Sequence, residues 1–371
     1  MQKQIEKRPR FCLIYFGIHS ASLLHACPDG FMSSPRKKIA VLGLGMMGNT
    51  HLASWLKRED SEVVVVSDPN PKRLSGEVSA EGNIDLLSDG GFDLSAIRTY
   101  TDFREAIRDP DVEAVDICLP TLFHIEVARL CAEEGKPFLL EKPIARNAEG
   151  VREILEAAES AGVLGMPALC LRFWPEWSWL KDTIDAGSHG RVISARFERI
   201  GACPGGRFYH NGELCGGALL DLHIHDTDFV LHCFGKPDGV TSYGYPRMSG
   251  EIDHVVTHYH YGDIPLVVAE GGWQPKNNLP FRMTYLVNFE NATVEYDLNA
   301  KESLKVYREG EDPEVIPVGE ENGYDLEIAE FMESLNNGTQ PCTATMASSL
   351  VSATIADAER ESIAQGCRVD L

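Results

Sequence analysis

An aspartate and a histidine occur four residues apart, at Asp221 and His225, in a stretch that the apolar pattern predicts to be one helix over residues 216–234. In an α-helix this spacing puts both side chains on one face, within reach of each other. A carboxylate beside an imidazole orients the ring and favours its protonated form, as a base that accepts a proton from a hydroxyl requires. The alternative is a salt-bridged helix face without a chemical role.

A lysine with a possible chemical role is Lys142, which lies between Glu141 and Pro143, directly after the apolar run 138–140. Partial burial there would lower the pKa of the lysine, so that it could donate a proton or polarise a carbonyl group. A solvated lysine paired with Glu141 is the alternative.

A glycine-rich turn follows the apolar run 39–42, with Gly43, Gly45 and Gly48 in the spacing G-x-G-x-x-G. The pattern is typical of a dinucleotide-binding turn. The first glycine allows the turn, the second leaves room for a pyrophosphate, and the third lets the next helix pack close to the sheet. Free N–H groups at the start of that helix, around Met46 and Met47, would face the phosphates.

An acid, Asp68, ends a second apolar strand and lies twenty residues after Gly48. This spacing fits a carboxylate that binds the adenosine ribose, which favours NAD, because a 2′-phosphate there would meet like charge. Asp68 could instead open the turn 68–71. Lys72 and Arg73 could neutralise a 2′-phosphate, so NADP remains possible.

The elements that must position these residues alternate between strands and helices in the first half of the chain. Strands predicted at 114–119 and 138–140 and helices predicted at 49–58 and 148–161 indicate a parallel, doubly wound sheet. Residues 72–100 are rich in Gly, Ser and Asp and receive no assignment. In such sheets ligands lie beyond the carboxyl ends of the strands. The predicted cofactor contacts on this rim are Gly43, Gly45, Met46, Met47, Gly48, Asp68, Pro120, Thr121, His124, Glu141 and Lys142; the alternative for His124 is a surface residue.

Strands dominate the second half, and they are predicted at 192–200, 240–245, 254–261, 266–273, 282–289, 292–296 and 304–306. Consecutive strands of this kind indicate a large, mainly antiparallel open sheet, with helices on one face and the other face available for a partner. Helices near 325–335 and 343–365 end the chain. We therefore expect an α/β fold, with a Rossmann domain over residues 37–165 and an α+β domain for substrate binding and oligomerisation over residues 166–371.

The chain has 371 residues and a formal net charge of −22, with 43% apolar and 24% charged residues. This length favours two domains, and the negative charge argues against nucleic acids and anionic membranes as partners. Ten cysteines without a C-x-x-C pair predict free, buried thiols in a reducing compartment, here the cytoplasm.

Residues 1–36 differ from the rest, because basic residues precede an apolar run over 11–24. That order resembles a signal peptide, and the protein would be exported if residues 1–31 act as one. Met32, just before the first strand, offers a natural start, so we expect a disordered or mis-started extension.

Three motifs together resemble the Gfo/Idh/MocA family of nicotinamide-dependent oxidoreductases. They are the glycine turn, the Glu141-Lys142-Pro143 segment, and the stretch that begins with two glycines and continues as Asp221-x-x-x-His225-x-x-Asp228. The resemblance covers about residue 38 to the C-terminus. It implies a two-domain enzyme with a nicotinamide between its domains, and substrates that are sugars, cyclitols or their derivatives.

The resemblance also implies roles for single residues. Lys142 matches the active-site lysine of the family, and Asp221 with His225 matches its acid–histidine pair. Pro120 and His124 match a Pro-Asn-x-x-His segment, in which Thr121 replaces the usual asparagine at one nicotinamide contact.

The predicted reaction is the reversible oxidation of a secondary alcohol on a polyol ring. His225 would take the hydroxyl proton and Lys142 would hold the oxygen while hydride passes to the nicotinamide. Candidate substrate contacts are Arg172, Trp174 and His210. The open sheet face suggests a homo-oligomer.

Three other hypotheses compete with this one. The first is a redox-neutral hydrolase or lyase that retains its NAD and acts on glycosides. The second is a metal site, although we predict none. Its candidate ligands form two groups: His223, His225, Asp226 and Asp228, which lie close together in the sequence, and His254, His258 and His260, which share one face of a predicted strand. The third is a cofactor-binding sensor, which the presence of Lys142, Asp221 and His225 disfavours.

Overall fold

The structure, a computed structural model, describes residues 36–76, 91–275 and 279–371. The extension predicted over residues 1–36 lies outside these ranges, except for Arg36. Residues 77–90 of the unassigned stretch also lie outside them. Among the described residues, no helix is both long and apolar enough to cross a membrane.

The first sheet is parallel, and its described strands follow the order β3-β2-β1-β4-β5-β6. This order is typical of doubly wound dinucleotide-binding sheets, so the predicted fold class of the first half is confirmed. The short strands β3 and β6 were not predicted. The strands are β1 (Lys37–Leu42), β2 (Ser61–Ser67), β3 (Arg98–Tyr100), β4 (Ala114–Ile117), β5 (Phe138–Glu141) and β6 (Gly165–Ala168).

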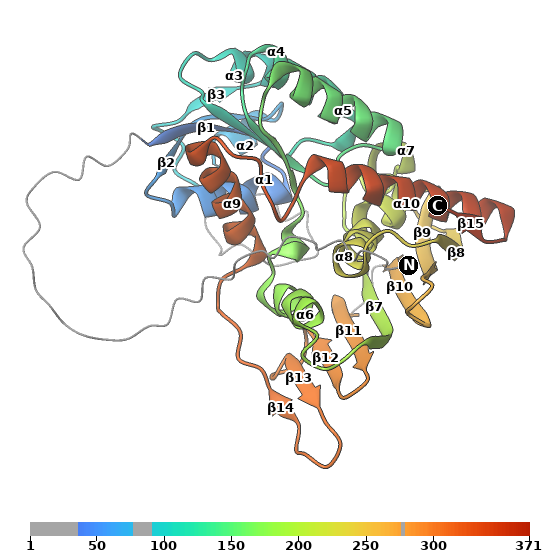
Figure 1. The fold of residues 1–371 in the computed structure, drawn as a ribbon. Helices are drawn as coiled ribbons and strands as arrows, with labels where there is room; N and C mark the ends of the chain where they lie inside the picture. Colours follow the sequence, from blue (N-terminus) through green and yellow to red (C-terminus); the bar gives the residue numbers. More distant parts are fainter. Residues whose placement is uncertain (1–35, 77–90, 276–278) are drawn as a thin grey trace, which may run out of the picture. The chain divides into compact units, whose positions relative to one another are not determined.

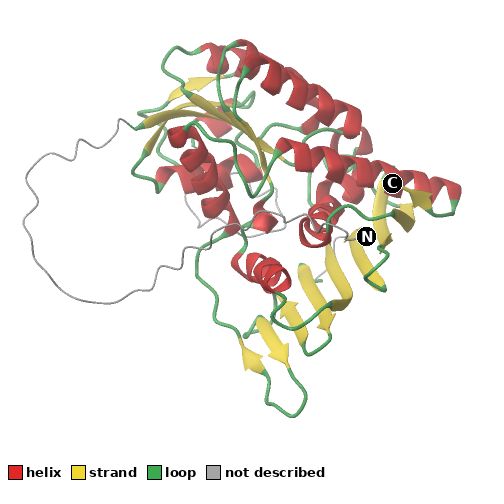
Figure 2. Cartoon of the chain, viewed as in Figure 1, coloured by secondary structure: helices red, strands yellow, loops and turns green. Residues whose placement is uncertain are grey.

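Helices connect these strands (Figures 1 and 2). The longest of them, α5, has the bounds expected from the sequence, because the Asn147 side chain accepts a hydrogen bond from the Gly150 N–H at its start and left-handed Gly162 ends it. The elements are α1 (Met46–Leu56), α2 (Pro71–Leu74), α3 (Phe103–Arg108), η1 (Thr121–Phe123), α4 (His124–Glu133) and α5 (Ala148–Ala161).

The second sheet has the order β14-β13-β12-β11-β7-β10-β9-β8-β15 among the described strands. Its β7–β10 pair is parallel and the other pairs are antiparallel, so the predicted mainly antiparallel open sheet is confirmed. The strands are β7 (Val192–Ala202), β8 (Gly239–Pro246), β9 (Ile252–His260), β10 (Leu266–Gln274), β11 (Arg282–Phe289), β12 (Thr293–Asp297), β13 (Leu304–Tyr307), β14 (Glu314–Val315) and β15 (Val369–Asp370).

Helices of the second half cover one face of this sheet. The other face carries exposed apolar residues, among them Tyr243, Tyr245, Leu266 and Leu286. The helical elements of this half are η2 (Cys170–Arg172), α6 (Pro175–Ala186), α7 (Gly212–Cys215), the π-helical turn η3 (Leu219–His223), α8 (Ile224–Phe234), α9 (Gly323–Asn337) and α10 (Met346–Gln365).

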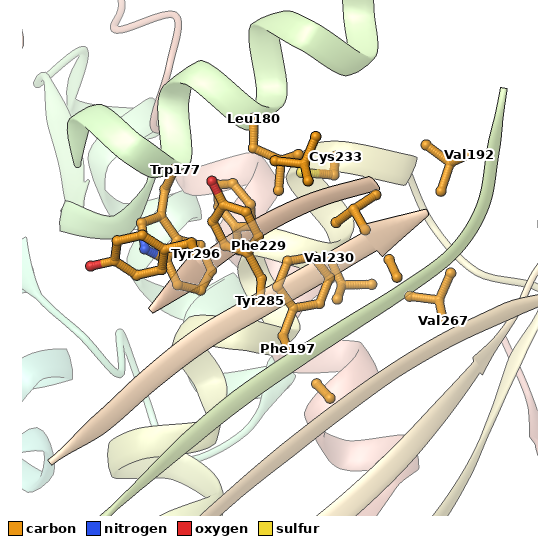
Figure 3. Packing of buried hydrophobic residues seen from close by; sticks show 14 of the residues in the cluster. Trp177, Leu180, Val192, Phe197, Phe229, Val230, Cys233, Val267, Tyr285 and Tyr296 are labelled. Atoms are coloured by element: carbon orange, nitrogen blue, oxygen red, sulfur yellow. The ribbon is translucent and has the colours of Figure 1, made fainter. Parts of the chain in front are cut away.

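The core of the second half is centred on Trp177 of α6 (Figure 3). Its fully buried indole lies edge-on to Phe229 of α8, with 4.8 Å between ring centroids, and to Tyr285 of β11, with 5.2 Å. It also stacks against Phe197 of β7. This packing holds α6 and α8 against the sheet.

The two C-terminal helices return to the first sheet. Phe331 and Met332 of α9 are fully buried together with Ile39 and Leu52 of the first half, and Met346 of α10 joins the core on the sheet's other side. The boundary predicted after residue 165 remains a prediction, although β6 carries the first sheet to Ala168.

Eight described cysteines are free thiols. Cys118, Cys131, Cys170, Cys203, Cys215 and Cys233 are buried or partly buried, whereas Cys342 and Cys367 are exposed, contrary to the expectation that all are buried. Cys12 and Cys27 lie outside the described residues.

Substitution Trp177→Ala should lower the free energy of unfolding by about 3–5 kcal/mol, because it leaves a cavity among packed rings. Tyr243→Ala, at an exposed position of the same sheet, should change it by less than about 0.5 kcal/mol. Urea denaturation of both variants measures the difference, and equal values would show that the ring cluster does not centre the core.

Candidate active site

The glycine turn has the geometry that its spacing predicts. Gly43 has a φ of +87°, and a Cβ atom there would lie 2.6 Å from the Cys118 carbonyl oxygen. A Cβ atom on Gly48 would lie 1.6 Å from the Gly43 carbonyl oxygen. Gly45 has open space around its missing Cβ. The outer two glycines therefore shape the turn, and Gly45 leaves its outer side free.

The turn forms one end of a cavity of about 350 Å³, a volume within the range of small-molecule sites. Gly45, Met46 and Met47 line it, and α1 starts there without a side-chain cap, so the N–H groups of its first turn lack intrahelical partners. These groups and the helix dipole favour an anion such as a pyrophosphate.

Asp68 lies next to the glycine turn, and only 2% of it is exposed. Its carboxylate accepts hydrogen bonds from the Leu44 N–H at 2.9 Å and from the Asn70 N–H at 2.8 Å, and Arg73 Nη1 lies 3.3 Å from it. The turn-opening alternative is therefore realised, while the ribose contact remains a prediction. Arg73 also lines the cavity.

Lys142, directly after β5, reaches from the first half of the chain to the second. Its Nζ donates a hydrogen bond to the Asp221 carbonyl oxygen at 2.7 Å and lies 3.4 Å from Asp221 Oδ1. Burial by itself lowers the pKa of Lys142, but Asp221 and Glu141 outweigh it and raise the pKa above the ordinary lysine value. The predicted lowering is therefore wrong, and Lys142 is an ammonium ion at neutral pH.

Asp221 and His225 both line the cavity, but the predicted contact between them is absent from the described part of the chain. The helix expected over residues 216–234 begins with the π-helical turn η3 and becomes α-helical only at Ile224. A π turn bonds residues five apart, so the rule for residues four apart in an α-helix does not apply. Asp221 pairs with Lys142 instead.

His225 has a pKa well below the ordinary histidine value. Burial is the main cause, and the positive charges of Lys142 and Arg199 add to it. The expected stabilisation of the protonated ring is wrong, because the nearby charges that act on it are cations. The imidazole is thus neutral at neutral pH and able to accept a proton.

Pro120 and Thr121 line the cavity as expected, whereas His124 does not. His124 is 1% exposed, and its Nε2 lies 2.7 Å from the Leu119 carbonyl oxygen while its Nδ1 lies 3.0 Å from that of Pro143. Burial lowers the pKa of the ring. The predicted cofactor contact is replaced by a structural role, in which His124 links the chain after β4 to the chain after β5.

Among the three candidate substrate contacts, only Trp174 lines the cavity. Arg172 is buried and forms a bidentate ion pair with Asp228, at 2.8 and 2.7 Å, so its guanidinium has a structural partner. His210 is exposed and outside the cavity wall, which takes the neighbouring Phe208 and Tyr209 instead.

The sequence reasoning missed several wall residues. Arg199 on β7 is 4% exposed, and its guanidinium pairs with Asp226 at 2.8 Å. It lies on the same face of β7 as the buried Ala195 and Phe197, so a charged residue within an apolar strand face was an available signal. Other missed wall residues include Cys118, Cys170, Phe208, Tyr209, Trp273, Phe281, Met283, Leu298 and Tyr324.

The hypothetical metal ligands do not converge. Their partners differ: His223 contacts Glu359, Asp226 pairs with Arg199, and His254 pairs with Glu270. His223 and Asp226 of the helical stretch and His254 of β9 thus face separate neighbours. Among the described residues, no three of these candidate ligands bring their ligand atoms together.

The glycine turn gives a matched pair of variants. Gly48→Ala should break the turn, because its Cβ clashes with backbone, and should lower Tm and abolish dinucleotide binding. Gly45→Ala should leave Tm unchanged but weaken NAD⁺ binding about tenfold, close to 1.4 kcal/mol, by filling the space for a pyrophosphate. Calorimetric titration tests this, and wild-type affinity in Gly45→Ala would contradict it.

Comparison with known proteins agrees with this geometry. A family model described as an oxidoreductase family with an NAD-binding Rossmann fold matches residues 37–168, and one for the GFO/IDH/MocA C-terminal domain matches residues 177–295. Scyllo-inositol 2-dehydrogenase (NAD(+)) of Bacillus subtilis is 25% identical over 82% of this chain and 87% of its own length.

Two further similarities are narrower or more distant. Myo-inositol 2-dehydrogenase of Thermotoga maritima is 28% identical, over 54% of this chain and 55% of its own length. A solved levoglucosan dehydrogenase in complex with NADH superposes with a TM-score of 0.77, at 19% identity, over 90% of this chain and 99% of that chain. With both family models matched in order, the chain belongs to the Gfo/Idh/MocA family of oxidoreductases, and its first half is an NAD-binding Rossmann domain.

Proposed function

We propose that this protein oxidises a secondary alcohol of a sugar or cyclitol and passes the hydride to NAD⁺. The observation that carries the proposal is one cavity whose wall includes the glycine turn at Gly45, Lys142 from the first half and His225 from the second. The similar proteins support the substrate class, because their names specify inositols and levoglucosan.

The chemistry follows from the charges of the two side chains. When bound, the nicotinamide supplies the hydride acceptor. The neutral ring of His225 takes the hydroxyl proton, and the ammonium group of Lys142 holds the same oxygen and stabilises the negative charge that develops on it. Asp221 keeps the lysine charged and directed into the cavity. In the reverse direction His225 returns the proton to the oxygen.

The aromatic wall suits a ring substrate. Tyr209 lies edge-on to Trp273, with 5.8 Å between ring centroids, and Trp174 lies edge-on to Tyr324, with 5.7 Å. Such walls pack against the C–H face of a sugar or cyclitol and leave its hydroxyl groups to polar side chains.

Net hydride transfer is favoured over the redox-neutral hydrolase or lyase, because the similar proteins are named as dehydrogenases. The presence of both an ammonium group and a neutral imidazole in the wall likewise favours an enzyme over a sensor. Accumulation of NADH with a cyclitol or hexose as substrate would distinguish these cases.

Self-association and a cytoplasmic location are further parts of the proposal. The exposed apolar residues Tyr243, Tyr245, Leu266 and Leu286 on the uncovered sheet face support a homo-oligomer. Free thiols support a reducing compartment.

Substitutions Lys142→Ala and His225→Ala should each lower kcat at least about 10²-fold, since each removes a group that acts on the reacting oxygen. NAD⁺ affinity, measured by titration, should stay near the wild-type value. The controls Lys57→Ala and His189→Ala remove the same side-chain types away from the cavity and should keep wild-type kcat. Parallel loss of NAD⁺ binding and turnover would count against these roles.

The acidic limb of kcat/KM should lie below pH 6.5, because burial, Lys142 and Arg199 lower the pKa of His225 well below that value. The base is neutral above its pKa and protonated, hence inactive, below it. Rate profiles with the NAD⁺ dissociation constant measured at each pH separate the base from cofactor binding. A limb centred above pH 7 would contradict the assignment.

A further inference from the structure

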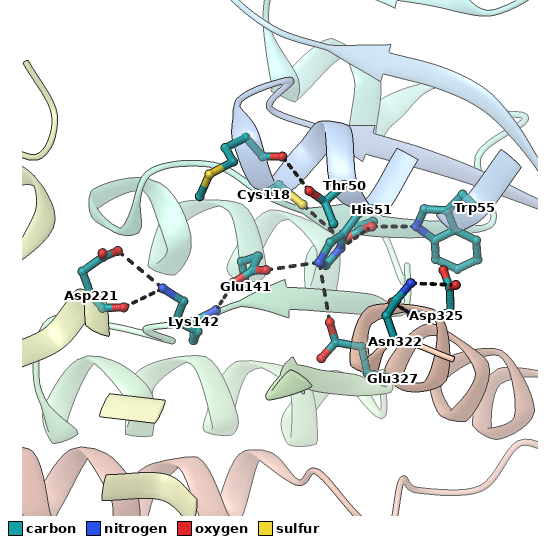
Figure 4. A network of polar contacts seen from close by, with 12 residues as sticks. Thr50, His51, Trp55, Cys118, Glu141, Lys142, Asp221, Asn322, Asp325 and Glu327 are labelled. Atoms are coloured by element: carbon teal, nitrogen blue, oxygen red, sulfur yellow. Dashed lines mark hydrogen bonds and ion pairs between the residues drawn. The ribbon is translucent and has the colours of Figure 1, made fainter. Parts of the chain in front are cut away.

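A buried histidine outside the cavity wall, His51, lies behind the proposed active-site lysine. It belongs to α1, about one and a half turns after the helix begins at the glycine turn, and its side chain is fully buried. Nδ1 lies 2.9 Å from Asp116 Oδ2, and Nε2 lies 3.1 Å from Glu141 Oε1 (Figure 4). The ring therefore connects α1 to the carboxyl ends of β4 and β5.

Glu141 carries this connection to Lys142. One carboxylate oxygen of Glu141 forms an ion pair with His51 Nε2 that lacks the geometry of a hydrogen bond. The other accepts a hydrogen bond from the Lys142 backbone N–H at 2.9 Å. The side chain of Lys142 then reaches Asp221. A continuous series of polar contacts thus runs from the helix at the cofactor end of the cavity to the group that would hold the substrate oxygen (Figure 4).

The charges of His51 and the acids around it favour these contacts. Burial lowers the pKa of His51, but Asp116 outweighs it and raises the pKa well above the ordinary value, so both ring nitrogens carry protons. A third acid, Glu327 of α9, lies 3.6 Å from Nε2, and burial raises its pKa, which favours its neutral form. One imidazolium ion thus faces two carboxylates, Asp116 and Glu141.

Cys118 also lies close enough to His51 and Asp116 for the three to form a metal-binding set among the described residues. The Trp55 indole N–H also donates to Asp116, at 2.6 Å. The Cys118 thiol donates to Asp116 as well, at 3.6 Å. A proton on His51 Nδ1, the indole N–H and this thiol thus account for the contacts of the carboxylate.

We propose that His51 is a positioning residue for Lys142, acting through Glu141. This inference rests on the role proposed above for Lys142. By holding Glu141, His51 fixes the backbone that carries the lysine relative to α1, and therefore relative to a dinucleotide bound at the start of that helix.

The test is a matched pair of substitutions at one position. In His51→Asn the amide nitrogen lies near the place of Nδ1, so the contact with Asp116 is kept and that with Glu141 is lost; in His51→Gln the amide nitrogen lies near the place of Nε2 and the reverse holds. We expect His51→Asn to lower kcat about 10²-fold and His51→Gln to lower it less than about fivefold. NAD⁺ affinity should stay within about threefold of wild type in both.

A purely structural histidine would give a different result. Equal losses of kcat in the two variants, or a larger loss in His51→Gln, would overturn the proposal. Glu327→Gln is the control, since it alters a neighbour of His51 that does not touch Lys142, and it should keep wild-type kcat.

A second measurement covers the case in which His51→Asn folds poorly. Glu141→Gln alone should lower kcat, and adding His51→Asn to it should cost little more, because both substitutions break the same connection. Additive losses would refute action through Glu141. If Lys142→Ala kept turnover, the role proposed for the lysine would itself be wrong. If Lys142→Ala is inactive but the kcat losses of Glu141→Gln and His51→Asn add up in the double variant, only the positioning role of His51 is overturned.

Discussion

The contact between Lys142 and Asp221 is the interaction on which the site depends. It joins the end of a parallel strand in the first sheet to an irregular helical turn in the second half, and it places an ammonium group where the two halves meet. Lys142 contacts both the backbone carbonyl and the side-chain carboxylate of Asp221. The backbone of the π-helical turn therefore binds the lysine directly. Irregular turns of this type occur often at functional sites, since they redirect side chains that a regular helix would place elsewhere.

The surroundings of Lys142 and His225 shift the pKa values of these two side chains in opposite directions. Acids around Lys142 hold it protonated, while burial and the cations Lys142 and Arg199 hold His225 neutral. Two titratable groups whose surroundings push their pKa values apart are what a paired electrophile and base require. Arg199 contributes in two ways, because its ion pair with Asp226 also anchors α8, next to His225, on β7.

Periodicity and spacing predicted the glycine turn and most strands of both sheets, but not the short strands β3 and β6 or the helix α6. The roles of Gly43, Gly45 and Gly48 depend on backbone geometry, which their spacing determines directly. His124 and Arg172 were misassigned because the sequence does not reveal which buried partner a polar side chain meets, here backbone carbonyls in one case and Asp228 in the other. The predicted direction of the His225 pKa shift was wrong for a related reason. Burial is the main cause of the lowered pKa, and the charges of Lys142 and Arg199, both distant in sequence, add to it.

The C-terminal helices α9 and α10 pack against the first sheet. This packing explains how two halves with separate sheets keep a fixed position relative to each other. Phe331 and Met332 of α9 are completely buried against α1 and the first sheet, and Trp55 of α1 lies edge-on to Phe331, with 6.4 Å between ring centroids. Parting the halves would expose these side chains to water, at a cost of about 1.5–3 kcal/mol for each large apolar residue. The last helices of the chain, far in sequence from Lys142 and His225, therefore restrain the separation between those two side chains. Glu327, which faces His51, lies on the same helix, so the apolar packing that restrains the halves and the polar cluster behind Lys142 share one element.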